Sequence, residues 1–133
     1  MMKKSGVTLV EVLAASAIFG LVIIGIMGIF TVSVETSKKI NHEYTATILS
    51  KNRIERLRNV NFGLLSTAAE TDTRVNSSGT ADPDGEFLRT TTVTTDYGGS
   101  KNLVKVEVNV YYEYQGTKNQ VPATMELLYT DIQ

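Results

Sequence analysis

The residue with the clearest chemical potential is Glu11, the only charged side chain between Lys4 and Glu35. It stands at the start of an apolar stretch, in which Val12 to Val34 include no charged residue and no histidine. A charge deep in a bilayer costs about 2.5 to 3.5 kcal/mol on insertion scales, so a carboxylate here indicates a function. The alternative is that Glu11 lies at the level of the lipid headgroups, where a carboxylate costs little. Position alone leaves both interpretations open.

The remaining side chains give little support to catalysis. The chain has no cysteine and a single histidine, His42, which is predicted to be a surface residue in a polar helical stretch. Asp82 and Asp84 lack the further ligands that an EF-hand needs at fixed spacing, so Asp82-Pro83-Asp84-Gly85 is interpreted as a turn. We therefore predict no enzyme activity, no metal site and no cofactor, and no small-molecule ligand can be identified.

The overall charge gives no general attraction for nucleic acid. The 133 residues include 13 Lys plus Arg and 14 Asp plus Glu, a formal net charge of -1. The basic residues Lys51, Arg53, Arg56 and Arg58 fall on different sides of a helix, and Glu55 follows Lys51 at the spacing of an ordinary surface ion pair. DNA binding is not supported, and these side chains are interpreted as a solvated helix surface.

The uncharged stretch from Val12 to Val34 is long enough to cross a bilayer, for which roughly 20 apolar helical residues suffice. A secretory signal places its small-residue cleavage site after the apolar region, but here Ser5-Gly6 precedes it. Cleavage after Gly6 would leave the helix on the mature protein. Lys3 and Lys4 favour a cytoplasmic N-terminus, which predicts a single-pass protein with its C-terminal bulk across the membrane.

The string Lys3-Lys-Ser-Gly-Val-Thr-Leu-Val-Glu-Val12 resembles the leader of type IV pilins and type II secretion pseudopilins. It has a short basic leader, a glycine before the cut, Thr-Leu, and a glutamate as the fifth residue after the cut. The resemblance implies that a prepilin peptidase cuts between Gly6 and Val7 and methylates the new amine of Val7. It also implies that Glu11 aligns and neutralises that amine on a neighbouring subunit, although both residues could also meet within one chain. Val7 departs from the usual phenylalanine.

The resemblance implies a bacterial inner-membrane protein that later joins a periplasmic or extracellular filament. Its implied partners are the prepilin peptidase, other pilin or pseudopilin subunits and inner-membrane lipid. The segment 46–62 resembles the helix end of PilV-type minor pilins and I-type minor pseudopilins, which indicates a minor subunit. The rival interpretation is a single-pass anchored binding or sensor protein that never enters a filament.

The predicted organisation is α+β, with a leader at 1–6, a hydrophobic transmembrane and polymerisation helix at 7–34, and a head at 35–133. The helix continues to about residue 60, and Ile40, Tyr44 and Ile48, followed by Ile54 and Leu57, predict the side that packs on the head. Gly20, Gly25 and Gly28 within the apolar helix are compatible with close helix approach, local melting or the ordinary glycine content of membrane helices.

The head is predicted to hold a loop at 61–85 and antiparallel strands at 86–132. In the central strand, 103–114, apolar residues alternate with polar ones, which predicts one buried face. The turns at 96–99 and 115–119 join it to its neighbours, and Val121, Ala123, Met125, Leu127 and Tyr129 share the inner face of the last strand. The prediction is a three-stranded meander covering the soluble half of the helix.

Overall fold

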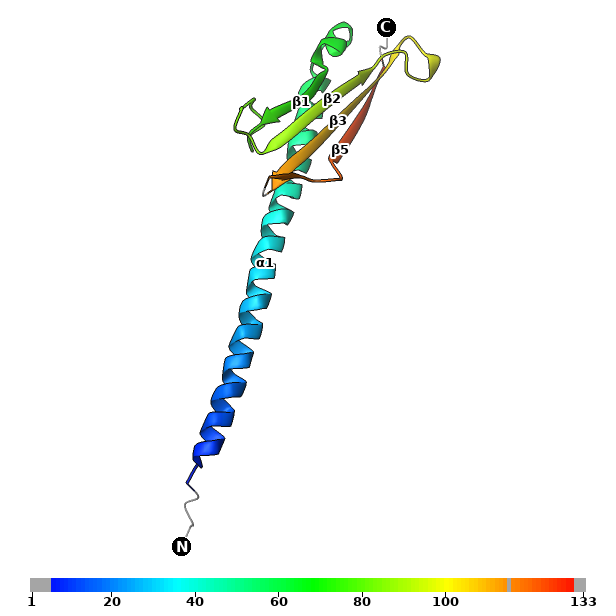
Figure 1. Cartoon of the computed structure of the whole chain (residues 1–133). Helices are drawn as coiled ribbons and strands as arrows, with labels where there is room; N and C mark the ends of the chain where they lie inside the picture. The colour runs from blue at the N-terminus through cyan, green and yellow to red at the C-terminus, as the bar shows by residue number, and fades with distance from the viewer. Residues whose placement is uncertain (1–5, 115, 131–133) are drawn as a thin grey trace. The chain divides into compact units, whose positions relative to one another are not determined.

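The computed structural model describes residues 6–114 and 116–130 (Figure 1). It divides into two compact units, Met1–Lys38 and Lys39–Gln133, and helix α1, Leu9–Arg58, contributes to both. The predicted leader residues 1–5, the turn residue Gln115 and the end of the last predicted strand at 131–132 lie outside the described residues.

The first unit consists of the N-terminal stretch of α1. Almost all of its side chains are exposed, including large apolar ones such as Leu21, Ile24 and Ile29. The helix runs without interruption through Gly20, Gly25 and Gly28. The exposure of so apolar a helical stretch in the described chain indicates that lipid or other protein surrounds it.

The second unit contains an antiparallel sheet beside the C-terminal stretch of α1. The predicted meander is present as β2 (Phe87–Thr94), β3 (Leu103–Tyr114) and β5 (Ala123–Thr130). Strand β3 pairs with β2 on one side and with β5 on the other. The class of fold, a long apolar N-terminal helix with a C-terminal antiparallel sheet, is therefore confirmed.

The predicted number of strands was too low, because the sheet has two more. Strand β1, Glu70–Val75, pairs with β2, and the short β4, Thr117–Lys118, pairs with the end of β3. Strand β1 falls in the predicted loop 61–85, as does the 3₁₀ helix Phe62–Ala68. The sequence of β1 is mostly polar and its register shifts between Glu70 and Thr73, so its alternation is too weak to predict a strand.

The core lies between α1 and the inner face of the sheet. Ala46, Leu49, Ile54 and Leu57 are the buried apolar residues of α1. The facing row on β3 is also buried and consists of Val104, Val106, Val108, Val110 and Tyr112. Full burial of such a side chain contributes roughly 1.5 to 3 kcal/mol, so this row supplies much of the stability of the unit.

The predicted packing side of α1 was partly wrong. Ile54 and Leu57 are buried, but Ile40, Tyr44 and Ile48 are 57%, 67% and 37% exposed. Ala46 and Leu49 take the buried positions instead, so the sheet packs on a different side of the helix. Four-residue spacing places Ile40, Tyr44 and Ile48 on one face, and a face can be apolar for a reason other than contact with its own sheet.

The last strand behaves largely as predicted. Ala123, Met125, Leu127 and Tyr129 are partly buried and pack at the margin of the core, but Val121 is 78% exposed because it precedes the strand. Tyr129 also donates a hydrogen bond to the carbonyl oxygen of Arg58 at the end of α1. This contact joins the last strand to the helix terminus.

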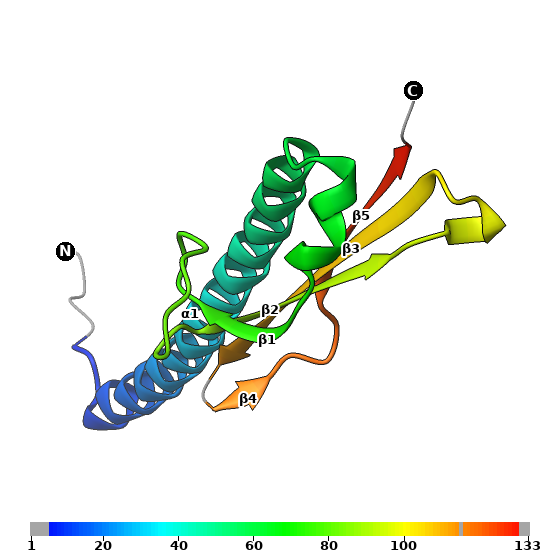
Figure 2. The ribbon, with the colours of Figure 1, turned by 90° about the horizontal axis from the view of Figure 1, so that it is seen from above.

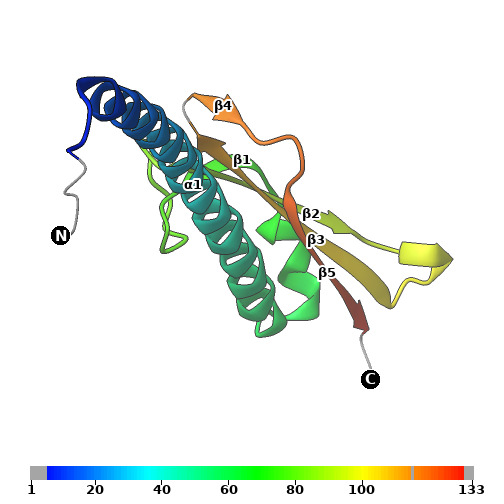
Figure 3. The same cartoon turned by 90° about the horizontal axis from the view of Figure 1, so that it is seen from below.

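Positive φ values and short-range hydrogen bonds shape the turns of the head. Asp96, Gly98 and Gly99 all have positive φ in the β2–β3 connection, whose yellow tip extends away from α1 in Figures 2 and 3. The side-chain oxygen of Asn76 accepts hydrogen bonds from Ser78 and Thr80. In the predicted turn at 82–85, the side-chain oxygen of Asp82 accepts from the Asp84 nitrogen. These short-range bonds hold the two turns.

Candidate functional site

The residues of the predicted N-terminal site lie at and just before the start of α1. Gly6 and Val7 precede the helix and are exposed, Thr8 occupies the N-cap position, and Leu9 is the first helical residue. Glu11 lies in the first helical turn. The structure therefore places the predicted cleavage position outside regular secondary structure, and Glu11 one turn beyond it.

Thr8 and Glu11 form reciprocal hydrogen bonds. The carboxylate of Glu11 accepts from the backbone nitrogen of Thr8 at 3.0 Å and from its hydroxyl at 3.1 Å. The Glu11 nitrogen in turn donates to the Thr8 hydroxyl at 3.3 Å. This is a capping box, in which a threonine at the N-cap and a glutamate three residues later satisfy free N–H groups at the helix start. It also places a negative charge at the positive end of the helix dipole.

Thr8 was missed as a site residue by the sequence analysis, although a signal for it exists. The spacing Thr-x-x-Glu directly before an apolar run is the sequence signature of a capping box. The leader pattern includes Thr8 but gives it no role of its own. Its hydroxyl in fact holds the Glu11 carboxylate at the helix start.

Two hydroxyl groups inside the apolar stretch form hydrogen bonds within the helix itself. The hydroxyl of Ser16 donates to the carbonyl oxygen of Val12, and that of Thr31 donates to the carbonyl oxygen of Met27. The most apolar 18-residue window of α1 has a mean hydropathy of 2.6, and none of it is buried. A continuous helix pairs its backbone polar groups internally, and with this apolar surface it meets the requirements of a lipid environment.

A comparison with family models identifies this region. Residues 1–31 match the family described as the prokaryotic N-terminal methylation motif. The match covers 31 of the 133 residues and includes Gly6, Val7, Thr8 and Glu11. No curated protein and no solved structure matches the chain.

In the second unit, His42 is not the surface residue that we predicted. Its side chain is only 20% exposed and its ring stacks on Tyr112, with centroids 5.5 Å apart and an interplanar angle of 15°. The ring centroids of Phe87 and Tyr114 lie 5.9 and 5.6 Å from the centroid of the His42 ring. The stretch around His42 is polar in sequence, but β2 and β3 bring aromatic rings to it. His42 is thus a packing residue at one end of the core.

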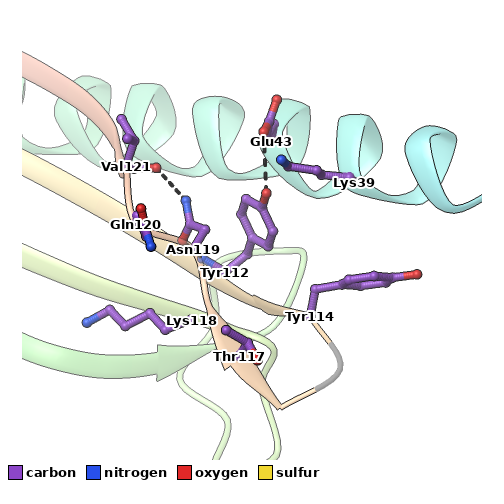
Figure 4. Close-up of a pocket in the computed structure, with 9 residues that line it drawn as sticks. All are labelled: Lys39, Glu43, Tyr112, Tyr114, Thr117, Lys118, Asn119, Gln120 and Val121. Atoms are coloured by element: carbon purple, nitrogen blue, oxygen red, sulfur yellow. Dashed lines mark hydrogen bonds between the residues drawn. The ribbon is translucent and has the colours of Figure 1, made fainter.

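A groove beside this aromatic cluster has a volume of about 510 Å³ (Figure 4). The Tyr112 hydroxyl donates to Glu43 at 3.3 Å, and burial together with the Glu43 charge raises the pKa of Tyr112. Asn119 accepts from the Tyr112 nitrogen at 2.8 Å and donates to the carbonyl oxygen of Val121. These hydrogen bonds fix the connection between β3 and β5 to the rest of the head.

The most buried ionic group of the head was not predicted. Glu70 accepts two hydrogen bonds from Arg89, at 2.6 and 3.2 Å, and one from Thr91 at 2.8 Å. Arg53 of α1 lies 3.3 Å from the same carboxylate and donates to the carbonyl oxygen of Ala68. We had interpreted Arg53 as a solvated residue, but it joins the helix to β1 and β2.

The pKa values in this cluster reflect opposing effects. Burial acts to raise the pKa of Glu70, but the hydrogen bonds from Arg89 and Thr91 and the two arginine charges outweigh it, so the pKa is lowered. Burial lowers the pKa of Arg53 in spite of the nearby Glu70 charge. The cluster fixes β1 and α1 to the sheet through a carboxylate that stays ionised.

Two other predictions concern surface charges and metal ligands. Lys51 and Glu55 form the predicted ion pair, at 3.8 Å between exposed side chains. Within residues 6–114 and 116–130, no group of three or more His, Cys, Asp or Glu side chains is placed to hold a metal ion.

Proposed function

We propose that this chain is a minor pilin or pseudopilin subunit that is processed between Gly6 and Val7 and polymerises through α1. In this proposal residues 1–6 are the leader, residues 7–34 form the membrane and polymerisation helix, and residues 35–133 form the exported head. The prepilin peptidase methylates the amine of Val7 after cleavage. The subunit then leaves the inner membrane for a type IV pilus or a type II secretion pseudopilus.

The observation that carries the proposal is the carboxylate of Glu11 at the start of an otherwise uncharged helix. The capping box with Thr8 holds this carboxylate at the helix terminus, next to the position of the new amine. In a low-dielectric environment an amine and a carboxylate each bear a desolvation cost, which pairing offsets. We propose that Glu11 pairs with the Val7 amine of a neighbouring subunit during assembly.

The test compares wild type with Glu11→Ala and Glu11→Gln in cells that lack the native copy. Glutamine retains the hydrogen-bonding capacity of a capping box but has no charge, so it separates capping from charge pairing. Stranding one member of a buried ion pair costs about 3 to 5 kcal/mol. We expect both variants to insert normally into the membrane and to be strongly depleted from sheared filaments.

The measurement is the ratio of protein in sheared filaments to protein in membranes. Equal incorporation of wild type and both variants would contradict the role of Glu11. A wild-type protein that stays entirely in membranes would favour a single-pass anchored binding or sensor protein.

A further inference from the structure

One face of α1 in the second unit is not covered by the sheet of the head. Ile40, Tyr44 and Ile48 are exposed on it, and the face continues through the exposed pair Lys51 and Glu55. Three exposed apolar side chains at four-residue spacing form a ridge that a second helix can pack against. The ridge ends in a positive and then a negative charge. An occupant must therefore match both an apolar part and a charged part.

The same chain carries a second face with the same spacing. Ile24, Gly28 and Val32 recur every four residues, and Glu35 and Lys39 follow with the intervals that separate Ile48 from Lys51 and Glu55. The order of charges is reversed, negative before positive. The residues of each face lie on one side of the helix, because steps of three and four residues return to the same side.

We propose that these two faces bind each other between two copies of this chain, with parallel helices displaced by 16 residues. This inference rests on the proposed function and specifies which helix faces meet in the filament. The displacement corresponds to about 24 Å at 1.5 Å per residue. It places Ile24 beside Ile40, Gly28 beside Tyr44, and Val32 beside Ile48 of the second copy. It also sets Glu35 beside Lys51 and Lys39 beside Glu55.

Charge complementarity selects this register. Glu35 meets Lys51, and Lys39 meets Glu55, so neither charge is left against the apolar ridge. The existing Lys51–Glu55 pair does not oppose this exchange strongly, because both side chains are more than half exposed and a surface pair contributes little. A displacement of 12 residues would set Lys39 beside Lys51, and one of 20 would set Glu35 beside Glu55, so both neighbouring registers place like charges together.

Gly28 fits this register, although Gly20 and Gly25 are equally free of intrachain contacts at the Cβ position. A glycine within a helix costs roughly 1 kcal/mol relative to alanine, so its presence needs a reason. A Cβ atom at Gly28 would meet nothing within 4 Å in the described chain, so no intrachain contact requires the glycine. Opposite Tyr44 of a second copy, the missing side chain makes room for a large aromatic ring. Small residues at such positions allow close helix approach in membranes.

The first test is a charge exchange in the full-length chain, scored by incorporation into sheared filaments. Glu35→Lys and Lys51→Glu each place like charges together, so we expect each single variant to lower incorporation roughly tenfold or more. The double variant restores opposite charges in every copy and should return incorporation to nearly the wild-type level. Failure of the double variant to recover beyond either single variant would overturn the register.

The second test uses disulfide formation, because the chain has no cysteine of its own. A chain with both Val32→Cys and Ile48→Cys should give a ladder of oligomers on oxidation of filaments. The matched control carries Val32→Cys and Glu55→Cys. Position 55 lies on the same face as position 48 but seven residues further along, about 10 Å, so the control should give no ladder.

The outcomes separate this inference from the proposed function. Filaments that contain the Val32→Cys, Ile48→Cys chain at normal levels but give no ladder would overturn the inference and leave the proposed function standing. An equal ladder from the control would also overturn the register. Absence of the unsubstituted wild-type chain from filaments would instead remove the proposed function, and this inference with it.

Discussion

Thr8 and Glu11 cap the start of α1 reciprocally, with the Glu11 carboxylate 3.0 Å from the Thr8 nitrogen and the Thr8 hydroxyl 3.3 Å from the Glu11 nitrogen. The pair orders the helix start and holds the carboxylate that we propose for assembly. Thr8 is therefore a positioning residue for Glu11. Its contribution can be measured separately from the charge of Glu11.

We predict that Thr8→Val loosens the first turn of α1 without affecting the head. Loss of an N-cap side chain costs about 0.5 to 2 kcal/mol of helix stability. In detergent micelles, amide hydrogen exchange in the first helical turn should become faster, while the melting temperature of the head stays the same. Thr8→Ser retains the hydroxyl and should exchange like wild type. Unchanged exchange in Thr8→Val would show that the capping box does not order the helix start.

The ion pair of Arg89 and Glu70 should be far more important for stability than the pair of Lys51 and Glu55. Arg89 is only 7% exposed, so Arg89→Met leaves the Glu70 carboxylate with fewer partners in a partly buried place. We expect a loss of about 3 kcal/mol in the free energy of unfolding, the lower end of the range for broken buried pairs. Lys51→Ala should cost less than about 1 kcal/mol. Urea denaturation of the full chain in micelles makes the comparison, and similar losses would contradict the assignment.

The lowered pKa of Glu70 predicts a loss of stability in acid. Its carboxylate has a lower pKa in the folded chain than in the unfolded chain, so the unfolded chain binds its proton first as the pH falls. The stabilisation is complete above the ordinary carboxyl pKa of about 4.3 and disappears as the pH falls through the folded value. Melting temperatures of wild type and Glu70→Gln should therefore converge in acid. A constant difference across the acid range would contradict this role.

We also predict that a fragment starting near Glu35 is soluble and folded. It lacks the uncharged stretch but keeps the buried residues of α1 and the strands that cover them. Circular dichroism should show both helix and strand, with a single cooperative thermal transition. A spectrum without ordered structure would mean that the head depends on the apolar helix or on another subunit for folding.

The extent to which the sequence predicted the fold depended on the strength of each pattern. The alternation in β3 is regular over its whole length, and the buried row from Val104 to Tyr112 followed from it. The polar strand β1 has no such alternation. It is held by pairing with β2 and by the Glu70 contacts, which are long-range interactions that a local pattern does not show.

The side of α1 that packs on the head was misjudged for a related reason. Ile40, Tyr44 and Ile48 form the more obvious apolar side, but Ala46 and Leu49 face the sheet. A sequence pattern reports that a helix face is apolar and does not report what covers it. Similarly, His42 has polar neighbours in sequence and aromatic neighbours in space. In the candidate site, Glu11 could be identified from its isolation among apolar residues, whereas the role of Thr8 was recognised from its hydrogen bonds.

The measurement that tests the central claim most directly is the intact mass of the protein purified from sheared filaments of its native host. The account predicts a mature chain that begins at Val7 and carries one methyl group on its N-terminal amine. Removal of residues 1–6 takes away Lys3 and Lys4 and leaves Glu11 as the fifth residue. A filament or membrane form that consists only of chains retaining Met1 to Gly6 would contradict the account.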